Sequence, residues 1–432
     1  MKDILILGAG KSASVLIEYM IEESAFNDWH VHVADVNPDT AANKTRGSER
    51  ASAYGINLEN ADQLSQLVQL ADIVISMLPP SMHTMVARSC LFHKKHFVNA
   101  SYLTPEIFEL DKEARSAGLS FICEMGLDPG IDHMSAMEII HEIKAQGGEI
   151  TSFKSHCGGL ISPESDDNPW HYKISWNPRN IVMAGKDGAT YLENNEVTHT
   201  SYNELFDPER KVQIPGVGDY AWYPNRDSLT YIEKYDLKEA ATFVRTTLRH
   251  PDFCLGWKKI IDCKLTDESI KYDTSGMDIR SFIDTHFERH QIPPIDNKSL
   301  SEIVAKQFKW FGLDSSEKID RGQCSAADIL QWIVEKKLGL QPEDKDMIIM
   351  MHEIEYILNG EIKNRRSHLV VKGTDNIHTA MAKTVGLPLA FAARNILNGN
   401  IRRRGVFIPI YPDIYEQILE DLNKYSIGFS ED

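Results

Sequence analysis

The apolar positions in the first third of the chain fall into short continuous runs separated by amphipathic stretches. The runs "DILIL", "HVHVAD", "ADIVIS", "HFVN" and "LSFIC" have the length and composition of buried strands. Strands that alternate with helical patterns in this way predict a doubly wound parallel sheet of the α/β class, from residue 4 to about residue 127.

A different pattern begins near residue 147. The segments "GGEITSFKSHCGGL", "YKISW", "RNIVMAG" and "ATYLENNEVTHT" look like strands joined by turns, which predicts an antiparallel, half-buried sheet. The chain from about 255 to 340 is helical and amphipathic, and "DMIIMMHEIEYI" and "SHLVVKG" return to strands. The tail segments "TAMAKTVGLPLAFAARNIL" and "PDIYEQILEDLNKY" predict two helices.

Composition limits the class of function. The 432 residues are 42% hydrophobic and 25% charged, as in ordinary globular proteins of two or three domains. The net charge of −17 argues against a general binder of nucleic acid or of an anionic membrane. No apolar run is long enough to predict a membrane helix, and the six cysteines include no C-x-x-C pair, so neither a metal site nor a disulfide framework is predicted. We therefore expect a cytoplasmic protein.

The glycine turn after the first apolar run is the first candidate for chemistry. Gly8, Gly10 and Ala13 form a G-x-G-x-x-A pattern between a strand and a helix, which is typical of dinucleotide-binding domains. Gly8 permits the turn, Gly10 lets phosphates approach the backbone, and Ala13 lets helix and strand pack closely. Amides at the start of the helix would face the pyrophosphate.

Asp35, at the end of the second apolar run, bears on which cofactor binds. A carboxylate there suits the ribose hydroxyls of an adenosine and repels a 2′-phosphate, so it favours NAD(H). Asp35 could instead be a turn or helix-cap residue. Lys44 and Arg46 follow closely and could hold a phosphate, so NADP(H) is the alternative.

The strand ends supply further candidates, because ligands of doubly wound sheets bind beyond the carboxyl ends of the strands. Segments 76–83, 99–105 and 124–133 follow predicted strands and should border one crevice. His133 is interpreted as a neighbour of a helix cap. The residues predicted at the cofactor are Gly8, Gly10, Lys11, Ser12, Ala13, Asp35, Met77, Leu78, Pro79, Ser101, Leu127 and Pro129.

Longer motifs carry a family resemblance. "SYLTPEI", "GLDPGIDH", "CGGLISPESDDNPWHYKISWNPRN", "YPNRDS" and "TTLRH" occur in this order, and the C-terminal "VGLPLAFAARNILNGNIRRRGVFIPI" follows them. In that set the chain resembles saccharopine reductase, the glutamate-forming saccharopine dehydrogenase family, over essentially its full length. The usual family form of the third motif is close to CGGLPAPE-x-x-DNPLGYKFSWSPRG, from which this chain departs at Ile161-Ser162, Trp170-His171 and Ile174.

The resemblance implies a fold and a reaction. The implied parts are a Rossmann domain over 1–132 completed by about 385–432, an α+β substrate domain over 133–254 and 341–384, and a small helical lobe over 255–340. The implied reaction, in lysine metabolism, interconverts saccharopine with L-glutamate and 2-aminoadipate 6-semialdehyde through an imine, with NAD(P) as hydride carrier. A homodimer is the common arrangement for such a chain.

The substrate chemistry selects a second set of residues. Saccharopine carries three carboxylates and a free α-amine, and arginine forks suit carboxylates. Arg179, Arg226 and Arg249 lie in the family-like motifs, where each could also form a structural salt bridge. Carboxylate or amide oxygens would suit the amine. The residues predicted at the substrate are Asp167, Asn168, Lys173, Arg179, Asn225, Arg226, Thr247 and Arg249.

Imine chemistry also needs proton transfer, for which Tyr102, Asp128 and Cys157 are the catalytic candidates. Their acid and base roles stay open. Asp128 could be a turn residue and Cys157 a small buried apolar side chain. The two glycines after Cys157 are interpreted as sites of close backbone approach to substrate or nicotinamide.

Three other functions remain open. They are a carboxyspermidine dehydrogenase-like imine reductase, a lysine 6-dehydrogenase, and a non-catalytic NAD-binding protein that has kept the fold. A diamine substrate would need a pocket richer in acids, and lysine carries one carboxylate. Three arginine motifs therefore favour saccharopine.

Overall fold

A computed structural model describes residues 1–294 and 300–431. The chain forms two compact units. The first contains residues 1–147 and 373–429, and the second contains residues 148–372 with residues 430–431. Among the described residues, no helix combines the length and the apolar content that crossing a bilayer requires.

The first unit is built on a parallel sheet, seven strands wide within the described residues. Its buried central strands coincide with the predicted apolar runs, and every neighbouring pair runs parallel, so the predicted α/β class with a doubly wound sheet is confirmed. In spatial order the strands are β17 (Gly405–Phe407), β6 (Ser120–Ile122), β5 (His96–Asn99), β4 (Ile73–Ser76), β1 (Lys2–Leu7), β2 (Trp29–Asp35) and β3 (Ala51–Gly55).

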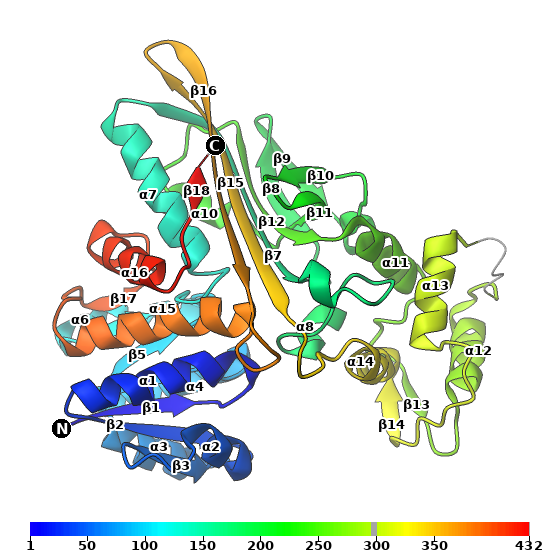
Figure 1. The fold of residues 1–432 in the computed structure, drawn as a ribbon, viewed down its shortest axis with the longest axis horizontal. Coiled ribbons are helices and arrows are strands. Elements are labelled where there is room, and N and C mark those ends of the chain that lie inside the picture. The colour runs from blue at the N-terminus through cyan, green and yellow to red at the C-terminus, as the bar shows by residue number, and fades with distance from the viewer. Residues whose placement is uncertain (295–299, 432) are drawn as a thin grey trace. The chain divides into compact units, whose positions relative to one another are not determined.

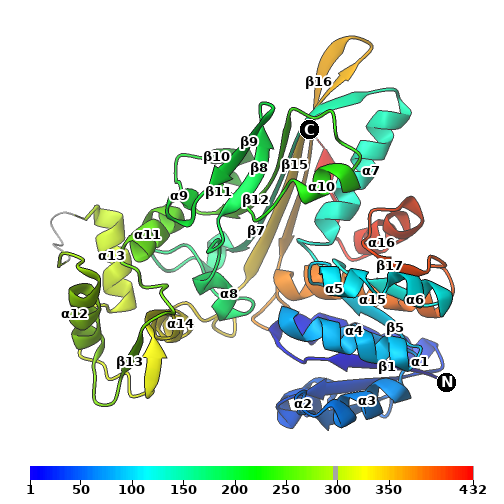
Figure 2. The same ribbon diagram turned by 180° about the vertical axis from the view of Figure 1, so that it is seen from behind.

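Helices cover both faces of this sheet. Helices α1 (Ser14–Phe26) and α15 (Ala380–Leu397) lie in front of it in Figure 1, and α3 (Ala61–Leu70) and α4 (His83–Phe92) lie in front in the reverse view of Figure 2. A Cβ on Gly386 of α15 would lie 3.0 Å from the backbone nitrogen of Leu16, so glycine lets the two helices approach closely.

The remaining helices of this unit are short or C-terminal. The predicted tail helices are confirmed as α15 and α16, and α16 packs on α7 through a 2.8 Å hydrogen bond between His141 Nδ1 and the Tyr415 hydroxyl. Their bounds are α2 (Pro38–Thr45), α5 (Pro105–Phe108), α6 (Asp111–Ser116), α7 (Ile131–Ala145) and α16 (Pro412–Lys424).

The second unit is built on a mixed sheet. Strands β7 and β12 pair in parallel, so the prediction of an antiparallel sheet holds only for the other pairs. The strands are β7 (Glu149–Ile161), β8 (Ala189–Glu193), β9 (Glu196–Thr200), β10 (Lys211–Ile214), β11 (Gly218–Pro224), β12 (Thr242–Arg249), β15 (Asp346–Leu358), β16 (Glu361–Lys372) and β18 (Ser430–Glu431).

Two predicted strands of this unit are wrong. In "YKISW" the alternation of apolar and polar residues does not separate an inner from an outer face, because Tyr172, Lys173, Ile174 and Ser175 are all buried. The Ile174 amide donates to Leu338 O at 2.7 Å, and the segment forms only an isolated bridge to another loop. "RNIVMAG" begins instead as helix α8 (Pro178–Val182), which the preceding Asn177 caps.

A helical region completes the second unit, and its buried side chains share one core with residues of the neighbouring strands and turns. Trp170 stacks on Phe311 with ring centroids 4.3 Å apart and also contacts Trp257 edge-on.

The predicted division into three domains stays a prediction. The elements are α9 (Tyr202–Leu205), α10 (Thr230–Lys234), α11 (Pro251–Asp262), α12 (Ile279–His290), α13 (Glu302–Phe311) and α14 (Ala326–Lys337), with the strand pair β13 (Lys271–Asp273) and β14 (Gln323–Ser325).

Candidate functional site

The glycine turn of the first unit follows strand β1. Gly8 has a φ of +95°, which a residue with a side chain rarely adopts, and its amide donates to Ala34 O at 2.8 Å. A Cβ on Gly8 would lie 3.0 Å from the carbonyl oxygen of Met77. The turn therefore packs directly against the end of β4, where Met77 and Leu78 are half-buried and Pro79 is exposed.

Gly10 has a different environment. Its φ is −64°, and a Cβ there would meet no heavy atom within 4 Å, so the backbone faces open space. Lys11, Ser12 and Ala13 follow, with Lys11 exposed, Ser12 half-buried and Ala13 buried. An open glycine immediately before a helix start is what a dinucleotide pyrophosphate requires, so these residues fit the cofactor.

Asp35 supports the glycine turn. Its Oδ2 accepts a hydrogen bond from the Ala9 amide at 2.7 Å, and its Oδ1 accepts from the Asn37 amide at 3.0 Å. The carboxylate thus ties the end of β2 to the turn and to the start of α2. Its predicted contact with the ribose stays a prediction.

Two cations lie beside the turn. The ammonium of half-buried Lys44 donates to Gly10 O at 2.7 Å and to the Ser14 hydroxyl, and burial lowers the pKa of Lys44 to about 8. Arg46 is exposed and pairs with Glu18 at 3.3 Å. Both cations lie at the C-terminal end of α2, and Lys44 contacts the glycine turn directly.

These groups border one cavity of about 420 Å³. Asn376 and Ile377 also line it, and sequence reasoning missed both because they lie far along the chain in a loop without a motif. The complete lining is Ala9, Gly10, Lys11, Ser14, Glu18, Thr40, Asn43, Lys44, Arg46, Asn376 and Ile377.

A buried histidine connects two of the strand ends. His83 Nδ1 lies 2.9 Å from the Ser76 hydroxyl, and its Nε2 lies 2.8 Å from the hydroxyl of Ser101, a predicted cofactor residue. Burial lowers the pKa of His83 to about 4, so the ring is neutral and one nitrogen donates while the other accepts. His83 thereby fixes the loop that carries Tyr102.

Glu124 and His133 connect the next pair of segments. Glu124 Oε1 accepts from the Leu103 amide at 3.0 Å, and its Oε2 lies 2.7 Å from His133 Nε2. Both side chains are fully buried, and His133 lies next to the helix cap, as interpreted, since Asp132 accepts from the amide of the N-cap residue Gly130. Between these two anchors, Leu127 and Pro129 are buried and Asp128 is half-buried, and Tyr102 is also half-buried.

Arg249, at the end of β12, is a buried cation of the second unit. This side chain is 5% exposed, its NH1 donates to Leu248 O at 2.8 Å, and its Nε has no hydrogen-bond partner among the described residues. The guanidinium lies 5.3 Å from the ring centre of Tyr172 and 5.7 Å from that of Phe253. Aromatic faces and carbonyl oxygens therefore surround a desolvated cation.

Cys157 and Thr247 are cross-strand neighbours in the β7–β12 pair. Cys157 is 6% exposed. Thr247 is hydrogen-bonded to Tyr223, a residue that sequence reasoning missed and whose pKa is raised by burial. The next residue, Gly158, has a packing role: a Cβ there would lie 2.7 Å from Leu248 Cβ, so glycine allows β7 and β12 to pack.

Asp167 and Asn168, predicted to bind the free amine, and Lys173, predicted near the carboxylates, are engaged within the protein. Lys173 is 5% exposed and donates to Asp167 at 2.9 Å and to Asp344 at 2.8 Å. The Asn168 side chain donates to Tyr172 O at 3.1 Å and accepts from the Trp170 amide at 3.0 Å. These contacts shape the turn, and the binding role of Asp167, Asn168 and Lys173 stays a prediction.

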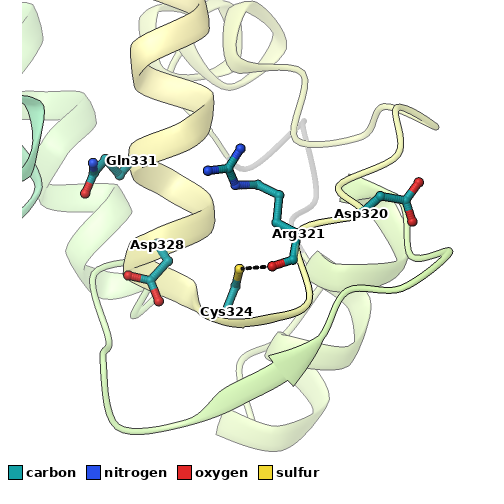
Figure 3. A pocket seen from close by; sticks show the side chains of 5 residues that line it. All are labelled: Asp320, Arg321, Cys324, Asp328 and Gln331. Carbon is teal, nitrogen blue, oxygen red and sulfur yellow. Dashed lines mark hydrogen bonds between the residues drawn. The ribbon is translucent and has the colours of Figure 1, made fainter. Parts of the chain in front are cut away.

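Arg179 is engaged by acidic partners of the helical region. Its guanidinium donates to Glu268 and, at 3.1 Å, to Asp328, one of five residues that line a polar cavity of about 480 Å³ (Figure 3). Burial acts against ionisation of Asp328, but bonds from Lys271 and Ser325 hold its pKa well below the usual range. Arg179 thus belongs to an ion-pair network. Its contact with substrate stays a prediction.

The last two predicted substrate residues lie after β11. The Asn225 amide donates to Arg245 O at 2.8 Å, and its side chain is half-buried. Arg226 is exposed with a φ of +52°, and its carbonyl accepts from the Thr190 amide at 2.8 Å. Asn225 thus extends the β11–β12 pairing at Arg245, whereas Arg226 pairs with Thr190 of β8.

The first unit defines a class of protein. A parallel sheet of this order, with an open glycine turn at its first strand and a cationic cavity beside that turn, is a Rossmann domain for a dinucleotide.

Comparison with known proteins gives the family. Residues 4–122 match the family model "Saccharopine dehydrogenase NADP binding domain", and residues 126–427 match "Saccharopine dehydrogenase C-terminal domain". The chain therefore belongs to the saccharopine dehydrogenase family, as the motifs predicted.

Individual relatives agree with this assignment. The chain is 32% identical to "Saccharopine dehydrogenase [NADP(+), L-glutamate-forming]" of Pyricularia oryzae, covering 100% of this chain and 98% of the relative. It is 33% identical to "Alpha-aminoadipic semialdehyde synthase, mitochondrial" of Bos taurus, covering 99% of this chain but only 47% of that protein, so the chain spans about half the length of such relatives. The apo saccharopine dehydrogenase (L-Glu forming) structure of Saccharomyces cerevisiae superposes with a TM-score of 0.87 at 29% identity, covering 100% and 99% of the two chains.

The family settles the enzyme class and the kind of cofactor. The matched family models and relatives are named as saccharopine dehydrogenases, the class of nicotinamide-dependent oxidoreductase acting on a CH–NH bond that the sequence predicted. The matched domain description names NADP, which is favoured over the NAD(H) that Asp35 led us to expect.

The buried Lys173 pair generates a prediction about stability. Replacing Asp344 by Asn should lower the free energy of unfolding by about 2–3 kcal/mol, because it leaves a buried ammonium with one carboxylate. Asp167→Asn is the matched control: Asp167 is 64% exposed, and its loss should cost less than about 1 kcal/mol. Urea unfolding measures both, and equal costs would contradict the assignment of Asp344 as the main counter-ion.

Proposed function

We propose that this protein is a glutamate-forming saccharopine dehydrogenase that uses NADP(H). In the oxidative direction saccharopine, NADP⁺ and water give L-glutamate, 2-aminoadipate 6-semialdehyde, NADPH and a proton. The observation that carries the proposal is Arg249, a buried guanidinium whose described contacts are carbonyl oxygens and aromatic rings. Such a cation favours an anionic ligand, and a substrate with three carboxylates supplies one.

The same observation separates the candidate functions. A diamine substrate would gain from a pocket rich in acids, whereas the buried cation at the end of β12 repels amines. Tyr172 and Phe253 exclude water from the guanidinium and strengthen its interaction with a carboxylate. The geometry thus supports an amino-acid substrate with several carboxylates over a diamine.

The chain's own residues have defined tasks in this reaction. A nicotinamide, when bound beside the glycine turn, would supply hydride transfer at the carbon next to the secondary amine. Arg249 holds a substrate carboxylate and orients that carbon. Tyr102, Asp128 and Cys157 are the groups proposed to move protons, first from the secondary amine and later to the departing amine of glutamate, each step contributing roughly 10²- to 10⁴-fold. The sharing of acid and base roles among them stays open.

NADP(H) is proposed over NAD(H) because two cations at the C-terminal end of α2 line the cavity beside the glycine turn. Both Asp35 oxygens accept backbone amides, so the carboxylate already has partners in the turn. Lys44 and Arg46 line the cavity beyond Gly10 and would hold a 2′-phosphate. Lys44 and Arg46 would then hold the 2′-phosphate, and Asp35, the residue that favours NAD(H), would not contact it.

A single assay tests the reaction. Nicotinamide absorbance is followed with purified protein, saccharopine and either NADP⁺ or NAD⁺, and we expect turnover with a higher kcat/KM for NADP⁺. Absence of turnover with both cofactors, from protein that binds NADPH, would reject the saccharopine assignment.

Arg249 allows a sharper test. Arg249→Met should raise KM for saccharopine about 10- to 100-fold, because one charge-assisted bond to a carboxylate contributes about 1.5–3 kcal/mol. KM for NADP⁺ should stay near the wild-type value. Arg249→Lys is the control that keeps the charge but not the planar fork, and it should give an intermediate KM. An unchanged KM for saccharopine in a folded Arg249→Met protein would remove this residue from the substrate site.

Lys44 should control the choice of cofactor, and its pKa of about 8 gives the test a pH signature. Charged Lys44 attracts the 2′-phosphate below that pKa, and the neutral amine does not above it. The ratio of kcat/KM for NADP⁺ to that for NAD⁺ should therefore fall as pH rises through about 8, because pH effects on the shared chemistry cancel in the ratio.

The variant Lys44→Met should lower this ratio about 10-fold or more at neutral pH and abolish its pH dependence. Arg46→Gln is the matched control at an exposed position, where solvent screening makes the loss smaller. An equal loss for both cofactors would mean that Lys44 only holds the Gly10–Ser14 turn.

A further inference from the structure

Two histidines and an aspartate converge at the start of helix α11. His171 Nε2 lies 3.4 Å from Asp252 Oδ2, and His250 Nδ1 lies 3.8 Å from the same oxygen. One donor atom from each residue lies within 4.8 Å of the others, and all three side chains are half-buried. Two imidazoles and one carboxylate are a common ligand set for zinc.

Asp166 orients one of these ligands. Its Oδ2 lies 2.6 Å from His171 Nδ1, and its buried Oδ1 has no hydrogen-bond partner among the described residues. A carboxylate bound to one ring nitrogen fixes the tautomer and directs the lone pair of the other nitrogen. Metal-binding histidines almost always have such a partner.

The backbone at His171 is left-handed, as it is at several other non-glycine residues of this chain. Its φ is +48°, in the left-handed region that glycine tolerates better than any residue with a Cβ. The family form CGGLPAPE-x-x-DNPLGYKFSWSPRG has glycine at this position. The chain therefore carries an imidazole side chain where the backbone conformation favours a residue without a side chain. Strain of this kind is characteristic of functional positions.

We propose that His171, His250 and Asp252 bind a divalent transition ion of the zinc class, with Asp166 as the partner that positions His171. Bonds of about 2.0–2.1 Å in a tetrahedral site separate the donor atoms by roughly 3.3–3.5 Å. The His171–Asp252 pair already has that separation. For His250 Nδ1 to bind the ion, it would lose the weak 3.2 Å hydrogen bond that it accepts from the Asp252 amide. Water would complete the coordination shell of the ion.

The ion would join two segments that carry predicted substrate residues. His171 and Asp166 belong to the turn that contains Asp167 and Asn168, and His250 directly follows Arg249. Binding therefore fixes that turn to the start of α11. This proposal rests on ligand geometry alone and is independent of the reaction proposed above.

Isothermal titration of the chelator-treated full chain with zinc chloride tests the site. We expect saturable one-to-one binding in the micromolar range. His171→Gly restores the family residue and relieves the backbone, so it should fold and turn over saccharopine like the wild type while binding zinc at least 10-fold more weakly. Asp166→Asn should weaken binding about 10- to 100-fold, the usual effect of losing such a partner. His199→Ala, at an exposed histidine outside the cluster, is the matched control and should leave binding unchanged.

Cobalt(II) gives an independent readout, since tetrahedral nitrogen and oxygen ligation produces intense visible absorption bands. The free cysteines are all buried, so thiolate ligation is not expected to contribute. Bands in the wild type that are lost in His171→Gly would support the site. The proposal is overturned if the wild type shows no saturable zinc binding up to millimolar concentration, or if folded His171→Gly binds zinc as tightly as the wild type.

Discussion

Removing a cation from water costs free energy, and this cost constrains which groups surround the buried cations of this protein. An isolated buried charge costs several kcal/mol, so each buried cation needs nearby oxygens, carboxylates or aromatic faces. Lys173 meets this requirement with two carboxylates at 2.8 and 2.9 Å. Among the described residues, Arg249 has carbonyl oxygens at 2.8 and 3.5 Å and two aromatic faces. The difference supports the proposed role of Arg249, because a cation that is already neutralised by carboxylates has less affinity for an anionic substrate.

The same reasoning applies to the cofactor cavity. General rules connect an acidic residue at the end of the second strand, here Asp35, with the ribose, and such a residue favours NAD(H). In the structure its oxygens are used by the Ala9 and Asn37 amides, whereas Lys44 contributes a cation to the cavity wall. A motif therefore identifies the residue type at a strand end, but the hydrogen bonds of that residue decide which cofactor it favours.

Sequence reasoning predicted the first unit well because its strands are continuous apolar runs and its turn requires glycine at Gly8. It missed the edge strand β3, whose residues are half-exposed and form no apolar run. It also failed at "YKISW", where both sets of alternating residues are buried, so periodicity carries no information about a strand. Among the site residues, Arg179 and Arg249 have equally suggestive motifs. Only three-dimensional contacts separate the one held by carboxylates from the one without them.

Trp170 and His171 are adjacent departures from the family form, and the packing of Trp170 bears on the conformation of His171. The Trp170 ring stacks on Phe311, and its Nε1 donates to Gln307 O at 3.3 Å, which anchors the turn in the helical core. A Cβ on Gly256 would lie 2.8 Å from this ring, so the large side chain is accommodated because α11 carries glycine there. With Trp170 fixed and the Tyr172 ring held beneath Arg249, the residue between them must reverse the chain in the left-handed conformation. The anchored neighbours thus impose the conformation that directs the imidazole of His171 towards His250, where the ring centres lie 3.9 Å apart.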